Sequence, residues 1–123
     1  MAVSYSFEKS FFILCGVDEY TTVDLKEKLE DAIADPQFPD DAMFILDVTA
    51  SKSLSERSNP DVEDMAAFLS SRSDRYGNSC AIVAKRPLHY GLMRMGSAIA
   101  EFHGMRTAVF ETLEEAKTWF EFE

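Results

Sequence analysis

The stretch MFILDV, residues 43–48, decides the fold class, because it is a short apolar run bounded by turn-forming residues. Its apolar residues do not alternate with polar ones, which is typical of a strand covered on both faces. Similar runs are SCAIVA at 79–84 and RTAVF at 106–110. Near the N-terminus, SYSFEKSFFILCG at 4–16 predicts a hairpin or a bent pair of strands. The chain therefore carries four or five strands.

Amphipathic segments alternate with these strands, at 21–35, 61–72, 87–104 and 112–122. The first predicts a helix capped by Thr21 or Thr22, with an apolar side made of Val23, Leu25, Leu29, Ala32 and Ile33. The third opens at Pro87 and closes at Gly104, residues typical of those positions. We therefore expect one α/β domain, residues 1–123, with a single mixed, mostly parallel sheet of four to five strands flanked by about four helices.

The helix expected at 87–104 carries two stripes of different character. One contains large apolar residues, which we expect to be buried: Leu88, Leu92, Met95, Ile99 and Phe102. The other has a small centre and predicts close packing, against the sheet or as an interaction or dimer face, through Met93, Gly96 and Ala100. His89 and His103 flank this stripe, but the helix between them spans about 21 Å. One metal ion cannot bridge them, so we expect no metal site.

Polar residues gather where two expected strands end. In an open α/β sheet, ligands bind beyond the carboxyl ends of the strands. One end presents Asp47, Thr49 and Ser51, and the next presents Lys85, Arg86, His89 and Tyr90. The basic residues and the amides of the following helix N-terminus would suit a small anionic ligand or an acidic partner. The alternative is that Lys85 and Arg86 only solubilise a loop.

Charge and composition argue against several classes of function. The 123-residue chain has 22 acidic and 12 basic side chains, a net charge of −10, so it should repel nucleic acid. No apolar run is long enough for a membrane span and no secretory signal opens the sequence, so we expect a cytoplasmic protein. Cys15 and Cys80 have the spacing of neither a zinc pair nor a redox pair, and we expect buried strand thiols.

The sequence contains none of the short motifs that mark common catalytic or cofactor sites, such as GxSxG, a P-loop, HExxH or GxGxxG. A catalytic set of a serine from 51–58, His89 and Asp47 could come together at the edge of the sheet, but nothing in the spacing of these residues requires it. We therefore expect no enzymatic activity and no cofactor.

The order of several motifs resembles the SpoIIAA-like family of the STAS superfamily. These motifs are LDVTAS at 46–51, CAIVA at 80–84, the short segments Tyr90-Gly91-Leu92 and Arg94-Met95, and AVFETLEEAKTWF at 108–120. The resemblance implies a small sheet packed with four helices and no catalytic activity. It also implies a role like that of related STAS domains, which are anti-sigma-factor antagonists or regulatory modules of transporters; the wider fold group has been compared with lipid-carrying SEC14 domains.

Signalling members of that family carry a phosphorylated serine in an Asp-Ser-Ser-Gly type motif after the Asp-bearing strand. The matching region here is TASKSLSERSNPDVED, residues 49–64, which lacks that motif. Ser51, Ser53, Ser55 and Ser58 are available hydroxyls, but the resemblance does not make any of them a phosphorylation site.

Two functions remain for testing. The leading one is a regulatory module that binds a protein partner or forms a homodimer. The alternative is a carrier or sensor of a small anionic or lipid-like ligand, favoured by Met93, Met95 and Met105, because methionine adapts to irregular apolar ligands. An extra cavity between the helices would favour this second function.

Overall fold

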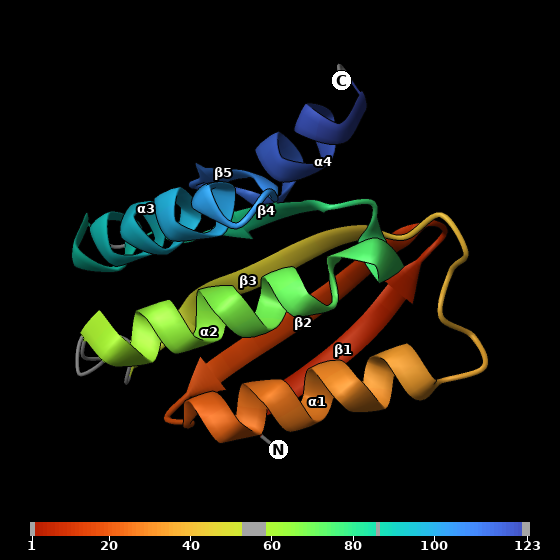
Figure 1. The fold of residues 1–123 in the computed structure, drawn as a ribbon, viewed down its shortest axis with the longest axis horizontal. Helices are drawn as coiled ribbons and strands as arrows, with labels where there is room; N and C mark the ends of the chain where they lie inside the picture. The colour runs from red at the N-terminus through yellow and green to blue at the C-terminus, as the bar shows by residue number, and fades with distance from the viewer. Residues whose placement is uncertain (1, 53–58, 86, 122–123) are drawn as a thin grey trace.

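The computed structural model describes residues 2–52, 59–85 and 87–121. In chain order the elements are β1 (Val3–Glu8), β2 (Phe11–Asp18), α1 (Thr22–Ala34), β3 (Met43–Ser51), α2 (Asn59–Ser71), β4 (Ser79–Val83), α3 (Pro87–Phe102), β5 (Arg106–Phe110) and α4 (Leu113–Glu121), with a short 3₁₀ helix at Ser73–Tyr76 (Figure 1). The expected α/β class, with a mostly parallel sheet and four α-helices, is confirmed.

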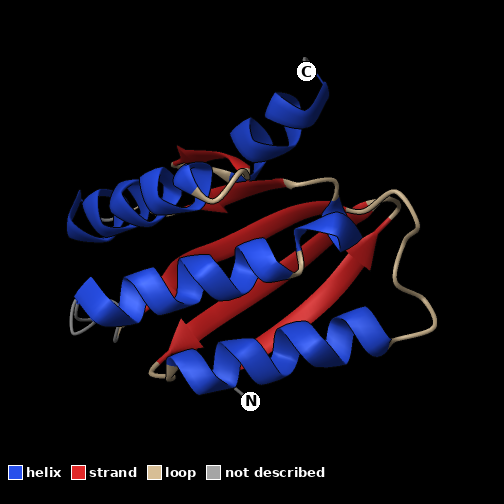
Figure 2. Ribbon diagram, viewed as in Figure 1, coloured by secondary structure: helices blue, strands red, loops and turns tan. Residues whose placement is uncertain are grey.

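The five strands form one sheet in the order β1-β2-β3-β4-β5. β1 pairs with β2 antiparallel, as the expected hairpin requires, and the other three pairings are parallel. Helices α1, α2 and α3 lie in front of the sheet in the view of Figure 2. Their side chains and the facing strand residues make the larger core, whereas α4 packs on the opposite face, where Ala116 lies over a smaller core.

The larger core is centred on aromatic rings from the strands. Phe12 of β2 stacks on Phe44 of β3, with ring centroids 4.8 Å apart, and Phe44 contacts Tyr76 at 4.6 Å. All three side chains are almost fully buried. Apolar runs that fill both faces of β2, β3 and β4 explain why their sequences do not alternate.

Helix α1 begins as expected but buries a narrower side than expected. Thr21 is its cap, in a capping box in which the Thr21 hydroxyl accepts from the Asp24 amide and the Asp24 carboxylate accepts from the Thr21 amide. Leu25, Leu29 and Ala32 are buried, but Val23 is 56% exposed, so its expected burial is wrong. At about 100° per residue, Val23 lies on the far side of the helix from Leu25.

Helix α3 buries a different side from the one its large residues indicated. Leu92, Met95 and Ile99 are only partly buried, whereas Ser97 and Ala100 are buried. The side chains of Leu88 and Phe102 lie outside the described residues. The reason is that α3 packs against both α2 and β5, so its small residues face inward. A methyl group on Gly96 would lie 3.4 Å from Val62 Cγ1 of α2, and Gly104 ends the helix at a φ of +96°.

Candidate functional site

The polar residues at the end of β3 bond within the chain. The Asp47 carboxylate accepts hydrogen bonds from the Thr49 amide at 3.0 Å and the Thr49 hydroxyl at 2.7 Å. Ser51 is buried, and its hydroxyl donates to the Gly16 carbonyl at 3.1 Å. The Tyr20 hydroxyl lies 2.5 Å from the Ser51 oxygen and therefore donates to it. Ser51 thus fastens β3 to β2 and to Tyr20, in the segment between β2 and α1.

Of the residues expected after β4, the side chains of Lys85 and Tyr90 lie within the described part of the chain, and neither bonds to the polar group at the end of β3. Lys85 is exposed, Arg86 lies outside the described residues, and so does the side chain of His89. Tyr90 lies at the edge of the sheet, where its hydroxyl donates to the Val109 carbonyl of β5 at 3.4 Å. Among the described side chains, no anion-binding cluster therefore assembles at the strand ends, and the predicted anion site stays a prediction.

An apolar cavity of about 60 Å³ lies between α1, α2, α3 and the sheet. Carbon atoms form nearly all of its wall. The lining residues are Thr22, Leu25, Leu46, Val48, Asp61, Val62, Met65, Ala66, Leu69, Cys80, Ile82, Met93, Gly96, Ala100, Met105 and Thr107. Two of the methionines that favoured an apolar ligand in the sequence, Met93 and Met105, line this cavity, but the sequence could not show that Met65 of α2 lies beside them.

The cavity explains where the small-residue stripe of α3 points. Met93, Gly96 and Ala100 all line it, so the stripe faces α2 inside the chain. Ala100 is 4% exposed, and its part in an interaction or dimer face stays a prediction. Met93 and Gly96 are half-buried, and their part in a contact between copies stays a prediction.

A second hollow, polar and about 460 Å³ in volume, lies between α3 and the edge strand β5. Tyr90, Arg94 and Glu101 line it. On its inner side the hydroxyls of Ser97 and Thr107 bond to each other, and the Thr107 hydroxyl also donates to the Ser97 carbonyl at 3.0 Å. These contacts fasten α3 to β5 and leave the rest of the hollow open to solvent.

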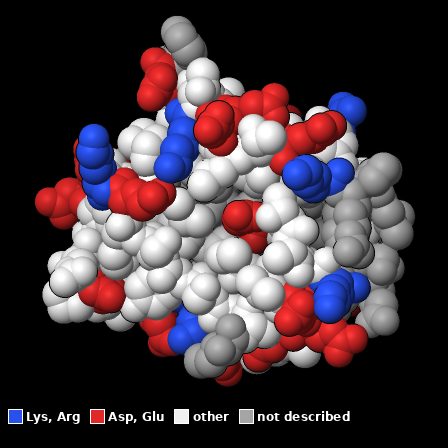
Figure 3. Space-filling view, turned by 180° about the vertical axis from the view of Figure 1, so that it is seen from behind, with Lys and Arg blue, Asp and Glu red and all other residues white. Residues whose placement is uncertain are grey.

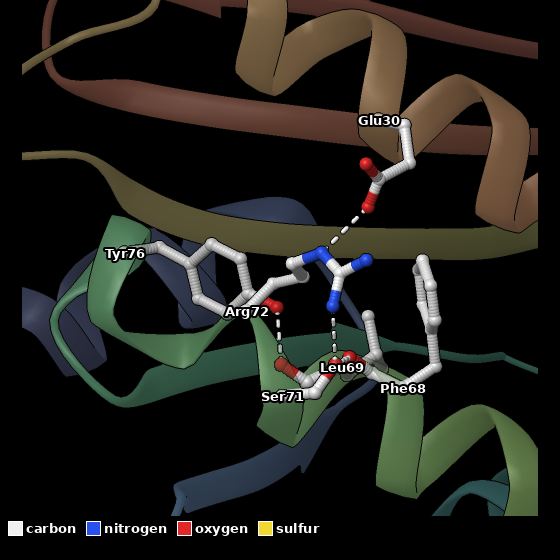
Figure 4. Close-up of polar contacts among 6 residues, drawn as sticks. All are labelled: Glu30, Phe68, Leu69, Ser71, Arg72 and Tyr76. Carbon is white, nitrogen blue, oxygen red and sulfur yellow. Dashed lines mark hydrogen bonds and ion pairs between the residues drawn. The ribbon is translucent and has the colours of Figure 1, made fainter.

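A polar cluster joins the end of α2 to α1 (Figure 4). The Arg72 guanidinium donates to the Glu30 carboxylate at 2.6 Å and lies 4.9 Å from the centre of the Phe68 ring. The Tyr76 hydroxyl donates to the Leu69 carbonyl, and burial raises the pKa of this phenol far above its ordinary value. The cluster has an evident structural role, because each polar group in it contacts a neighbouring element.

The thiols are unsuited to nucleophilic chemistry. Burial raises the pKa of Cys80 strongly, and burial together with the charge of Asp47 raises the pKa of Cys15. Both thiols are unpaired. In the described ranges no three histidine, cysteine or acidic residues gather as a metal site would require. No helix in the same ranges has the length and apolar character to cross a membrane.

The fold has a counterpart among solved structures. A variant of RsbS from Moorella thermoacetica superposes with a TM-score of 0.60, at 14% sequence identity, over 98% of this chain and 99% of that one. The protein has a STAS-type fold. No family model matches the sequence, and no curated protein matches it by sequence comparison. The recognition of a STAS-type pattern from LDVTAS, CAIVA and the C-terminal segment is therefore confirmed at the level of the fold.

Proposed function

We propose that this protein is a non-enzymatic regulatory module that acts by binding another protein. The observation that carries the proposal is the STAS-type fold over nearly the whole chain, because the family that the sequence resembles uses this fold for regulation through protein contacts. A cytoplasmic location, expected from the sequence, forms part of the same proposal.

The chemistry of the described side chains supports a role without catalysis. Asp47 is held by Thr49, Ser51 is held by Gly16 and Tyr20, and neither carboxylate nor hydroxyl contacts a candidate base. A nucleophile needs an adjacent base or a lowered pKa. The raised pKa of both thiols is the opposite of that requirement.

The surface that best suits a partner is the sheet face opposite α1, α2 and α3. Helix α4 covers only part of it, and beyond α4 Val17 is 36% exposed while Cys15 and Asp47 are half-buried. Figure 3 shows this side, with mostly uncharged atoms around an acidic group near its centre, and with further charged groups, mostly acidic, toward the rim. We expect the partner to present an apolar patch bordered by basic side chains, because the chain carries a net charge of −10.

Photo-crosslinking in cells tests this function. A photoreactive amino acid at Val17 reports on the partly uncovered sheet face, and the same amino acid at Val23, also exposed, reports on the outside of α1 as a matched control. We expect one discrete crosslinked protein from position 17 and not from position 23, and a complex when that protein and this chain are purified and mixed. Failure of the purified pair to form a complex would contradict the proposal.

A second candidate function is a carrier or sensor of an apolar ligand. The specific observation that favours it is the cavity between the helices, with Met65, Met93 and Met105 in its wall. The side chains of methionine are flexible and polarizable, so such a wall can adapt to a ligand larger than the empty space.

A further inference from the structure

The outer edge of β5 presents main-chain groups that no strand pairs with. β5 lies at one end of the sheet order, next to α3 (Figure 1). The Arg106 amide donates to the Asn78 carbonyl at 2.8 Å, so β5 bonds to β4 through every second residue, beginning with Arg106. The residues in between, Thr107 and Val109, therefore direct both their N–H and their C=O groups away from β4, to the free edge of the sheet.

These edge groups face the polar hollow between β5 and α3, because Thr107 and Val109 line it. The Val109 carbonyl accepts one hydrogen bond, from the Tyr90 hydroxyl, and its length of 3.4 Å makes it weak. Within the part of the chain that the structure describes, no hydrogen bond reaches the Val109 amide or the amide and carbonyl of Thr107. A row of unpaired main-chain groups at a sheet edge is a template for a further strand.

The hollow has room for a short strand. Its wall on α3 runs from Tyr90 to Glu101, which is about 16 Å of helix at 1.5 Å per residue. An extended chain of about five residues, at 3.3 Å per residue, covers the same length. The hollow's volume of about 460 Å³ lies within the range of clefts that hold ligands in proteins.

The other edge of the sheet, formed by β1, is less accessible. The Val17 amide donates to the Ala2 carbonyl at 2.7 Å, so Val3 and Phe7 direct their main-chain groups away from β2. Val3 is only 1% exposed, and the Phe7 ring packs against the ring of Phe38. An added strand would meet covered groups at one end of β1, so β5 is the edge that suits it.

We propose that β5 binds an extended segment of a partner protein, about five residues long, which lies in the hollow and becomes a sixth strand of the sheet. In antiparallel pairing, one residue of the segment exchanges two hydrogen bonds with Thr107 and another exchanges two with Val109. The polar wall favours small hydroxyl-bearing side chains at the positions that face α3. The charged side chains of that wall, Arg94 and Glu101, have opposite signs, so main-chain bonds rather than charge select the segment.

This contact goes beyond the protein-binding function proposed above and lies elsewhere on the molecule. Position 17 is in β2 and reports on the sheet face opposite α3, whereas the hollow lies between α3 and the edge strand β5.

The experiment uses the purified full chain, labelled with ¹⁵N, and the peptide acetyl-Thr-Val-Thr-Val-Thr-amide, which places its threonines on one side and has uncharged ends. Backbone NMR should show the amide protons of Thr107 and Val109 moving downfield and exchanging more slowly with solvent as they become hydrogen-bonded. The amide of Phe7, at the other edge of the sheet, should stay unchanged. We expect a dissociation constant on the order of 1 mM, as three or four main-chain hydrogen bonds would give.

A modified peptide and a pair of variants make the test specific. The same peptide with all its amide nitrogens methylated keeps its side chains but cannot donate, and it should not bind. Ala98→Phe places a ring in the hollow from an exposed position on α3 and should weaken binding about tenfold or more. Ala67→Phe adds the same ring at an exposed position on α2, away from the hollow, and should leave binding unchanged.

Three results would overturn strand addition at β5. One is the absence of shifts at Thr107 and Val109 at about ten times the expected dissociation constant. The others are equal binding of the methylated peptide, which needs no variant to fold, and equal effects of Ala98→Phe and Ala67→Phe. None of these results bears on whether the purified partner captured at position 17 binds, so the two contacts stand or fall separately.

Discussion

Filling the cavity should stabilise the protein, and Ala66→Val is the smallest change that does so. Ala66 lies in the cavity wall on α2 and is 4% exposed. The cavity volume of 60 Å³ at about 24 cal/mol per Å³ corresponds to roughly 1.4 kcal/mol of recoverable stability. Burial of two added methyl groups gives a similar figure, about 1.6 kcal/mol. Valine lowers helix stability by roughly 0.6 kcal/mol relative to alanine, so the net gain should be about 0.8 kcal/mol.

Ala67→Val is the matched control, because Ala67 is the next residue of α2 and is exposed. This variant should lose only the difference in helix propensity between alanine and valine, which lowers the free energy of unfolding by roughly 0.6 kcal/mol. Urea unfolding followed by circular dichroism gives both free energies of unfolding, provided that the slope m is unchanged. The two variants should therefore differ by about 1.4 kcal/mol, with Ala66→Val the more stable. A less stable Ala66→Val protein would refute the reasoning, since it would mean that the space is not an empty apolar void.

Three further predictions concern the polar contacts and the titrating groups. Ser51→Ala should lower the free energy of unfolding by about 1–2 kcal/mol, because it leaves the buried Gly16 carbonyl without this donor; an unchanged urea midpoint would contradict the structural role of Ser51. Stability should fall as pH rises above about 9, because the raised pKa of Cys80 and Tyr76 keeps both protonated in the folded state while the unfolded chain ionises at its ordinary values of 9.0 and 10.0. The slope should reach about 1.4 kcal/mol per pH unit for each group, and a flat urea midpoint between pH 8 and pH 11 would count against it. With iodoacetamide at pH 8, Cys15 should react more slowly than a free thiol, and Cys80 should react only after the protein unfolds. Mass spectrometry gives the two alkylation rates, and similar rates for both thiols in the folded protein would be inconsistent with their burial.

The strands could be predicted from the sequence because burial on both faces leaves a direct trace in it. MFILDV and SCAIVA each supply consecutive apolar residues, and both form central strands in which those residues, except the half-buried Met43, are buried. The threonine cap of α1 could be predicted as well, since Thr21 and Asp24, which form the capping box, are only three residues apart in the sequence. Local chemistry of this kind depends on no other part of the chain.

The inward side of α3 could be predicted only in part, because it depends on two neighbours: the small-residue stripe indicated close packing, but not that α2 is the element it packs against. Hydrophobic spacing within the helix pointed to Leu92, Met95 and Ile99, whereas contact with both α2 and β5 turned Gly96, Ser97 and Ala100 inward. The predicted burial of Val23 was wrong for a related reason, because Val23 is apolar but lies outside the narrow side that α1 buries.

The candidate site depended even more on long-range contacts. Ser51 was expected to face a ligand at the strand end, but Gly16 and Tyr20, more than thirty residues earlier in the chain, hold its hydroxyl inside the protein. The cavity has the same character, because its wall combines three helices and the sheet. Of the residues in its wall, only Met93 and Met105 had pointed to an apolar ligand site in the sequence.

The most direct test of the proposed function is the affinity between this chain and the purified protein captured at position 17, measured by calorimetry at low and high salt. We expect a one-to-one complex with a dissociation constant below about 10 μM that weakens as salt rises. Val17→Glu should weaken it at least tenfold, and Val23→Glu, at the exposed control position, should not. If no complex forms, or if the two substitutions have equal effects, the protein does not act by binding a partner through its partly uncovered sheet face.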